Sequence, residues 1–246
     1  LRGRQPPPGN ALEVGALGVL LTLGATLQQI GISGTTVTNA GFLTALYVPL
    51  VPLLAWVIQR VRPHWSVWPT SLGCLWGSWL LAGVQGLDPA VGDLWVIGSS
   101  VFWALHVLFV GRIAERLAAP FLVACGQFLV CGMLSLLWAA LSETITLDGI
   151  RQALLPIVYA GVVSVAIGFT AQVIGQRHAQ PADAAIILSG ETVFAALFGF
   201  LLMGDRLPAS GLAGCALILL CIVVVQIAPL TLARQRVRAG RRSSPS

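Results

Sequence analysis

The stretch ADAAIILSGETVFAALFGFLLMG, residues 182–204, decides the fold of this chain. It is apolar nearly throughout, and as a helix rising about 1.5 Å per residue it would cross a bilayer. Glu191 lies close to its middle. Since a carboxylate at that depth costs about 2.5–3.5 kcal/mol, we expect Glu191 to face protein or a water-filled cavity. It either handles substrate or a proton there, or is a protonated side chain hydrogen-bonded to a neighbouring helix.

The composition is that of an integral membrane protein. Of the 246 residues, 57% are hydrophobic and 9% are charged, whereas soluble domains carry about 25% charged residues. The apolar runs lack the alternation of a lipid-facing β-barrel, so helices must be the spanning element. The five cysteines fall inside apolar runs without metal-ligand spacing, which predicts small core residues and no metal site. We therefore expect an all-α, multi-span helical bundle.

Eight apolar runs are long enough to span, and short loops with Pro or Gly separate them. They cover residues 12–31, 36–58, 67–84, 94–110, 121–141, 153–174, 182–203 and 211–227. With the N-terminal segment inside, 12 of the 14 Arg residues fall on the inside, and only Arg151 and Arg206 fall outside. This bias predicts a multi-pass protein of the bacterial inner (plasma) membrane with both termini cytoplasmic.

An internal repeat appears when the chain is shifted by 144 residues. Gln28, Ile30 and Gly31 then fall on Gln172, Ile174 and Gly175. Spans one to three match spans six to eight, and five spans separate each matched pair. Because five is odd, the two copies point in opposite directions across the membrane. Such inverted-topology repeats are typical of secondary transporters with a binding site near the midplane.

The repeat predicts three regions. Residues 1–86 form a partial first repeat of three spans, residues 92–228 form a complete second repeat of five, and residues 229–246 form an Arg-rich cytoplasmic tail. Two further spans are expected before Arg2. We therefore expect an N-terminally truncated chain. The alternative is a natural eight-span protein.

Three motifs resemble the EamA-like branch of the drug/metabolite transporter (DMT) superfamily. GDLWVIGSSVFWALHVLFVGR (residues 92–112) resembles the opening span of an EamA repeat. Residues 182–207 resemble its fourth span, and residues 211–225 its Gly-rich fifth span. The chain departs from the family at Thr192, where a Pro is usual, and at Asp205, where a Glu is usual. The resemblance implies ten spans in two five-span repeats, of which eight are seen here.

Polar and aromatic residues within the spans are candidates for substrate binding. Trp103 and His106 are three positions apart and share a helix face. Tyr47 is the repeat counterpart of Glu191, at similar depth. Each candidate also fits a structural role in packing or interhelical hydrogen bonding. The predicted substrate-binding residues are Glu191, Trp103, His106, Tyr47, Gln28, Gln172 and Gln127.

These patterns predict a secondary transporter that exports a small metabolite or amino acid by alternating access. Glu191 would bind a cationic group or exchange a proton, which makes proton coupling a further expectation. The alternative is a truncated, non-transporting membrane protein or a helper subunit. An enzyme is disfavoured because hydrolase, kinase and metal signatures are missing from the sequence.

The expected partners follow from the same patterns. They are a small-molecule substrate and the lipid bilayer, with no cofactor. The scattered basic charge gives no nucleic-acid signal. Homodimer formation is one alternative, since Gly73 and Gly77 form a small-xxx-small pattern that serves packing within one chain or between two.

Overall fold

The computed structural model describes residues 10–83, 91–203, 206 and 208–242, and every regular element in this part of the chain is a helix. Seven helical segments of the described part are long and apolar enough to cross a membrane. This confirms the expected all-α, multi-span bundle. The helices are α1 (Asn10–Ser33), α2 (Val37–Thr44), α3 (Tyr47–Gln59), α4 (Val67–Ala82), α5 (Val91–Leu117), α6 (Pro120–Ser142), α7 (Leu147–Gln152), α8 (Leu154–Val158), η1 (Tyr159–Phe169), α9 (Thr170–Gln176), α10 (Pro181–Leu188), α11 (Gly190–Phe198), η2 (Gly199–Met203) and α12 (Ala209–Arg242).

The third expected span, residues 67–84, is shorter in the structure. It corresponds to α4, whose 16 residues extend about 24 Å at 1.5 Å per residue. The hydrocarbon core is about 30 Å thick, so α4 alone is too short to cross it upright. Residue 84 lies outside the described residues. The eight expected spans are therefore seven long helical segments and one shorter helix, which packs along α12.

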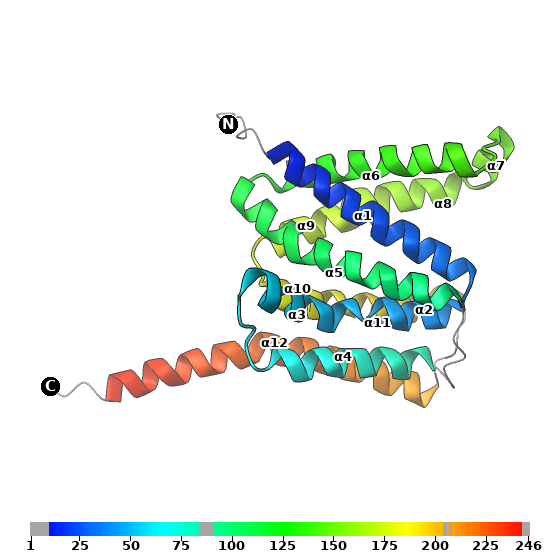
Figure 1. The fold of residues 1–246 in the computed structure, drawn as a ribbon. Coiled ribbons are helices and arrows are strands. Elements are labelled where there is room, and N and C mark those ends of the chain that lie inside the picture. The colour runs from blue at the N-terminus through cyan, green and yellow to red at the C-terminus, as the bar shows by residue number, and fades with distance from the viewer. Residues whose placement is uncertain (1–9, 84–90, 204–205, 207, 243–246) are drawn as a thin grey trace.

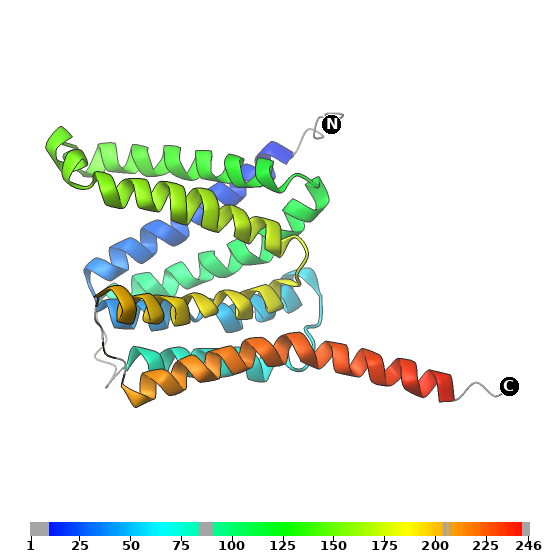
Figure 2. The ribbon, with the colours of Figure 1, turned by 180° about the vertical axis from the view of Figure 1, so that it is seen from behind.

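The spanning segments lie roughly parallel and alternate in direction along the chain (Figure 1). The start of α1 and the far end of α12 lie at the same end of the bundle, which we call the terminal end. Helix α12 projects beyond the other helices there, as both views show (Figures 1 and 2). Helix α1 and the segment from α8 to α9 run in opposite directions, as an inverted repeat requires.

The repeat also accounts for two interrupted helices. Helix α10 begins 144 residues after α2, at Pro181 against Val37, and ends 144 residues after it, at Leu188 against Thr44. Each eight-residue helix is followed at once by a second helix, α3 or α11. Helices α3 and α10 pack on each other, and so do α4 and α12. The two halves of the molecule therefore meet through the interrupted segments α2–α3 and α10–α11 and through the equivalent helices α4 and α12.

Different residues produce the two interruptions. Pro49 lies in the first turn of α3, where the N–H that it lacks has no helical partner to lose. In the second copy, Ser189 donates its hydroxyl to the Ile186 carbonyl (2.6 Å), and Thr192 donates to the Ser189 carbonyl (2.8 Å). Such side-chain bonds compete with the helical ladder and bend helices. The first interruption thus combines a proline with a hydroxyl bond from Thr44 to the Ala40 carbonyl, whereas the second has the two hydroxyl bonds of Ser189 and Thr192.

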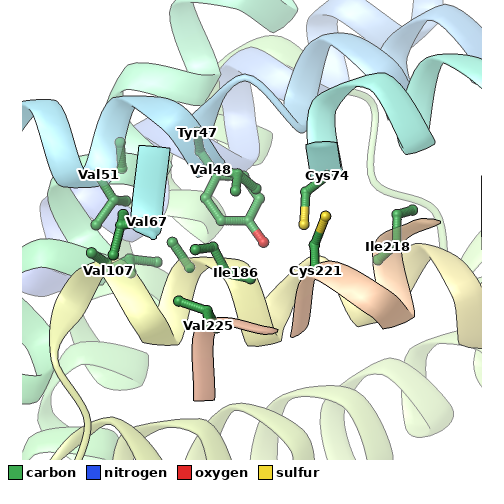
Figure 3. Packing of buried hydrophobic residues seen from close by; sticks show 13 residues of the cluster. Tyr47, Val48, Val51, Val67, Cys74, Val107, Ile186, Ile218, Cys221 and Val225 are labelled. Carbon is green, nitrogen blue, oxygen red and sulfur yellow. The ribbon is translucent and has the colours of Figure 1, made fainter. Parts of the chain in front are cut away.

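Helices α4 and α12 approach closely because glycines line their contact. A Cβ on Gly77 would lie 2.9 Å from the Gly214 carbonyl oxygen, and a Cβ on Gly214 would lie 2.8 Å from the Leu81 nitrogen. Cys74 and Cys221 face each other across the same contact, within a cluster that also holds Tyr47 (Figure 3). Gly77 of the predicted small-xxx-small pattern therefore serves packing within the chain.

The segment from α8 to η1 packs very differently from its repeat counterpart. In the described part of the chain no residue of α8 or η1 is buried, whereas α1 has seven buried residues. Helix α1 packs against both α5 and α6. The two halves thus share a helical pattern but not an environment.

The α4–α12 contact yields a stability prediction. Gly214→Ala places a methyl group against the backbone of α4, and overpacking of this kind costs about 1–3 kcal/mol. Gly132→Ala is the matched control, because a Cβ at Gly132 meets nothing within 4 Å and alanine favours a helix over glycine by about 1 kcal/mol. Thermal unfolding in detergent should show a lower midpoint for Gly214→Ala and an equal or higher one for Gly132→Ala. Equal midpoints in all three proteins would contradict the assigned contact.

Candidate functional site

A cavity of about 220 Å³ lies between the two repeats. Its walls come from α1, α2, α3, α5, η1, α9, α10 and α11. The lining residues are Gln28, Thr44, Tyr47, Trp103, Val107, Phe169, Gln172, Leu188 and Glu191. Helix α6, which carries the predicted residue Gln127, provides no lining residue within the described part of the chain.

Six of the nine lining residues form three pairs related by the repeat. The members of each pair are 144 positions apart, and the pairs are Gln28 with Gln172, Thr44 with Leu188, and Tyr47 with Glu191. The two interrupted helices supply two of the pairs. The cavity therefore lies on the pseudo-symmetry axis of the molecule, with equivalent positions on opposite walls.

Tyr47 and Glu191 occupy equivalent positions just after the helix interruptions. Tyr47 is the first residue of α3, is buried, and lies in the cluster of Figure 3. Glu191 lies in the first turn of α11, where the free N–H groups and helix dipole favour a negative charge. Its side chain and that of Tyr47 both line the cavity. The cavity lining includes no Arg, Lys or His, so Glu191 is its one formal charge among the described residues.

The two repeat-related glutamines differ in how their amides are used. Gln28 accepts a hydrogen bond from the Trp103 indole N–H (3.0 Å) and donates to the Thr44 hydroxyl (3.1 Å). Thr44 in turn donates to the Ala40 carbonyl (2.7 Å). This chain connects α1, α2 and α5 and fixes the Gln28 side chain. In the described part of the chain, Gln172 has no such partner, which leaves its amide available to a ligand.

Aromatic rings form the apolar part of the cavity wall. The Trp103 and Phe169 ring centroids are 6.1 Å apart, and Phe128 packs edge-on behind Phe169 at 6.3 Å. A cation close to such rings is attracted by their negative faces. The wall therefore suits a ligand with both a polar, positively charged part and an apolar part.

His106 and Gln127, both predicted to bind substrate, are not among the residues that line the cavity. Both side chains are fully buried, and His106 Nε2 lies 2.9 Å from Gln127 Oε1. His106 still contacts the Trp103 ring, edge to face, at 6.3 Å. Sequence spacing placed it correctly near Trp103. The hydrogen-bonding side chain on α6, however, holds it away from the cavity.

Four lining residues were not predicted from the sequence. Leu188 is the repeat partner of Thr44, and Thr44 lies three residues before Tyr47, so the repeat together with helical spacing could have found both. Val107 is one turn beyond Trp103 on α5. Phe169 is three residues before Gln172 but belongs to the wider turns of η1, which no sequence signal indicated.

Among the described residues, no group of three or more His, Cys, Asp or Glu side chains is placed to hold a metal ion. The cavity offers one carboxylate, one phenol, amides and aromatic faces. This set can bind a small solute through charge and hydrogen bonds.

Comparison with known proteins gives the class. The EamA-like transporter family matches residues 90–227. An Archaeoglobus fulgidus protein described as an uncharacterized transporter is 28% identical over 212 residues, which cover 86% of this chain and 67% of that protein. The uncharacterized transporter YwfM of Bacillus subtilis is 26% identical over 83% of this chain and 71% of its own length. A solved crystal structure shares the fold, with a TM-score of 0.72 and 22% identity over 95% of this chain and 79% of the other.

The fold and the family match define a multi-pass membrane transporter. The chain belongs to the EamA-like transporter family of the DMT superfamily. The resemblance seen in the sequence motifs is confirmed.

The buried His106–Gln127 pair yields a stability prediction. His106→Leu or Gln127→Leu alone leaves the other side chain without its hydrogen bond, which costs about 1–3 kcal/mol for a buried polar group. The double variant removes both partners, so it should lose less stability than the sum of the two single losses. Thermal unfolding of the four purified proteins in detergent measures this coupling. Losses that simply add would show that the two side chains act independently.

Proposed function

We propose that this protein is a secondary transporter that exports a small metabolite, such as an amino acid, across the bacterial inner membrane by alternating access. The observation that carries the proposal is the cavity itself. Three repeat-related residue pairs line it, so the binding position lies where two oppositely oriented halves meet. Inverted repeats around a central site are the architecture from which alternating access arises.

The inverted repeat supplies the two states that transport needs. When one half adopts the conformation of the other, the opening of the cavity moves from one membrane face to the opposite face. The interrupted helices α2–α3 and α10–α11 provide equivalent bending points for that exchange. Residues at these points, Tyr47 and Glu191, remain in contact with the solute in both states.

The cavity chemistry favours a small cationic or zwitterionic solute. Its volume of about 220 Å³ is below the range of roughly 300–1,000 Å³ typical of drug-sized ligands. Glu191 would bind a positively charged group, while Gln172 and the Tyr47 hydroxyl would bind polar atoms. Trp103 and Phe169 would cover the apolar part and add cation–π attraction.

A single carboxylate also supports proton coupling and export. A cationic group and a proton would compete for the same Glu191 oxygens, because a protonated carboxyl no longer attracts a cation. Exchange of one for the other would drive the solute outward as protons move inward. The direction of transport therefore follows from the inward proton gradient of a bacterial membrane.

The first test replaces the carboxylate. Cells that express the chain would be loaded with a panel of amino acids and small amines, and efflux would be measured over a pH series. Glu191→Gln should reduce efflux about tenfold or more, since a hydrogen bond to a charged group contributes about 1.5–3 kcal/mol and 1.4 kcal/mol is a factor of ten. It should also abolish the pH dependence.

The matched control for this test is Glu143→Gln, an exposed carboxylate at the end of α6. It should transport like the parent chain. Unchanged efflux with Glu191→Gln across the pH series would remove Glu191 from the mechanism. If the parent chain moves none of these solutes, the helper-subunit alternative is favoured.

The membrane orientation has its own test. Arg60, Arg62, Arg112, Arg116 and Arg177 lie at the terminal end. Arg151 and Arg206 lie at the other end. The positive-inside rule therefore places the terminal end in the cytoplasm. Alkaline phosphatase, which is active only outside the cytoplasm, should be active when fused after Thr146 and inactive when fused after Arg62. The reverse pattern would invert the proposed orientation and with it the direction of transport.

A further inference from the structure

A second polar pocket, of about 450 Å³, lies at the terminal end of the bundle. It is formed by the end of α3, the last turns of α5, the end of α9 and the turn that leads to α10. We call it the terminal vestibule. Its charged and amide-bearing lining residues are Gln59, Arg112, Glu115, Gln176, Arg177, His178 and Gln180.

The terminal vestibule is in line with the central cavity. On α5, Val107 lines the cavity, and Gly111, four residues later, lines the vestibule. On α9, Gln172 lines the cavity, and Gln176, also four residues later, lines the vestibule. Residues four apart lie on the same face of a helix, one turn apart. The same seam between α5 and α9 therefore borders both spaces.

The seam between the two spaces is closed by backbone contact. A Cβ on Gly111 would lie 2.6 Å from the Gln176 carbonyl oxygen, closer than real side chains approach. Glycine allows α5 and α9 to touch there. The vestibule is therefore a separate pocket in this structure, one helical turn from the cavity.

The ionisable side chains of the vestibule form no ion pair within the described part of the chain. The lining includes one carboxylate, Glu115, and three basic side chains, those of Arg112, Arg177 and His178. Arg116, the next arginine on α5, differs because it pairs with Glu13. Arg177 is half-buried, so its guanidinium is partly removed from water without a protein anion to compensate.

Gln176 adds a second, independent signal. It is 5% exposed, and neither its amide nitrogen nor its amide oxygen has a hydrogen-bond partner among the described residues. A buried polar group without a partner is destabilising. A ligand with anionic oxygens would accept hydrogen bonds from the Gln176 amide and from the planar fork of Arg177, which matches carboxylate and phosphate geometry.

We propose that the terminal vestibule binds the carboxylate or phosphate group of a small anionic or zwitterionic solute. Its role as a waiting position for the central cavity rests on the proposed transport function, but the binding itself does not. The same oxygens occur on soluble metabolites and on phospholipid headgroups. The polar lining favours the soluble source, because apart from Ala179 and Pro181 it offers no apolar side chain to an acyl chain.

The test measures binding of succinate and inorganic phosphate to the full chain in phosphatidylcholine nanodiscs by calorimetry. The parent chain should bind at least one of them. Arg177→Gln should weaken that binding about tenfold or more, through loss of the charged fork. Gln176→Leu should also weaken it while leaving the thermal midpoint equal or higher, because a buried unpartnered amide is removed. No binding by the parent chain, or equal binding by Arg177→Gln, would overturn the proposal.

Two controls make the result specific. Arg62→Gln removes an exposed positive charge outside the vestibule and should bind like the parent chain. An equal loss in Arg62→Gln would mean that only overall charge matters, which overturns the site. Phosphatidylglycerol in the nanodiscs should leave the affinity for the probes unchanged. Competition in the parent chain but not in Arg177→Gln would overturn the soluble source in favour of a lipid headgroup.

Glu191→Gln separates this proposal from the transport function. It should retain full binding of succinate or phosphate, because the vestibule lies outside the central cavity. Loss of binding in this variant would place the anion in the cavity and overturn the vestibule site. If the parent chain shows no efflux while it still binds the anion, the vestibule site stands and the proposed transport function does not.

Discussion

This structure depends on one constraint: within a bilayer, each backbone N–H and carbonyl group needs a hydrogen-bond partner. An open N–H or carbonyl is tolerated at membrane depth only where it is buried in protein or borders a water-filled space. Helices α2–α3 and α10–α11 are interrupted at equivalent positions, and the central cavity lies beside both interruptions. The interruptions therefore border the cavity, and the helix starts place Tyr47 and Glu191 in its wall.

The two halves share geometry but differ in chemistry. At equivalent positions, one wall carries Tyr47 and Thr44 while the other carries Glu191 and Leu188. A strictly symmetric cavity would offer a solute the same contacts in either state. Here the single carboxylate belongs to the second half. In the proposed transport cycle, the two access states would thus be equivalent in shape but not in charge, which suits the proposed coupling to a proton gradient.

Features that depend on sequence periodicity could be predicted from the sequence. Features that depend on the direction of a side chain could not. Five predicted site residues line the cavity, and four of them, Gln28, Gln172, Tyr47 and Glu191, are paired by the 144-residue shift. His106 shares a helix face with Trp103, yet the buried Gln127 on α6 decides where its ring points. The predicted span 67–84 corresponds to α4, which ends at Ala82, because apolar composition does not show where a helix ends. The arginines of the vestibule were counted only as topology anchors, because a linear sequence does not show that Arg112 and Arg177 face one pocket.

Glycine contacts connect the fold to movement. Helix pairs α1–α5, α4–α12 and α5–α9 each approach to backbone contact, at Gly31 and Gly92, Gly77 and Gly214, and Gly111 and Gln176. Lipid gives helices no hydrophobic reason to associate, so such pairs are held by close van der Waals packing. A surface without large interlocking side chains resists sliding or rocking less than a knobs-into-holes contact does. The glycines of the α1–α5 and α4–α12 contacts join the two repeats and would therefore let one repeat move against the other. The Gly111 contact lies within the second repeat, between the vestibule and the cavity.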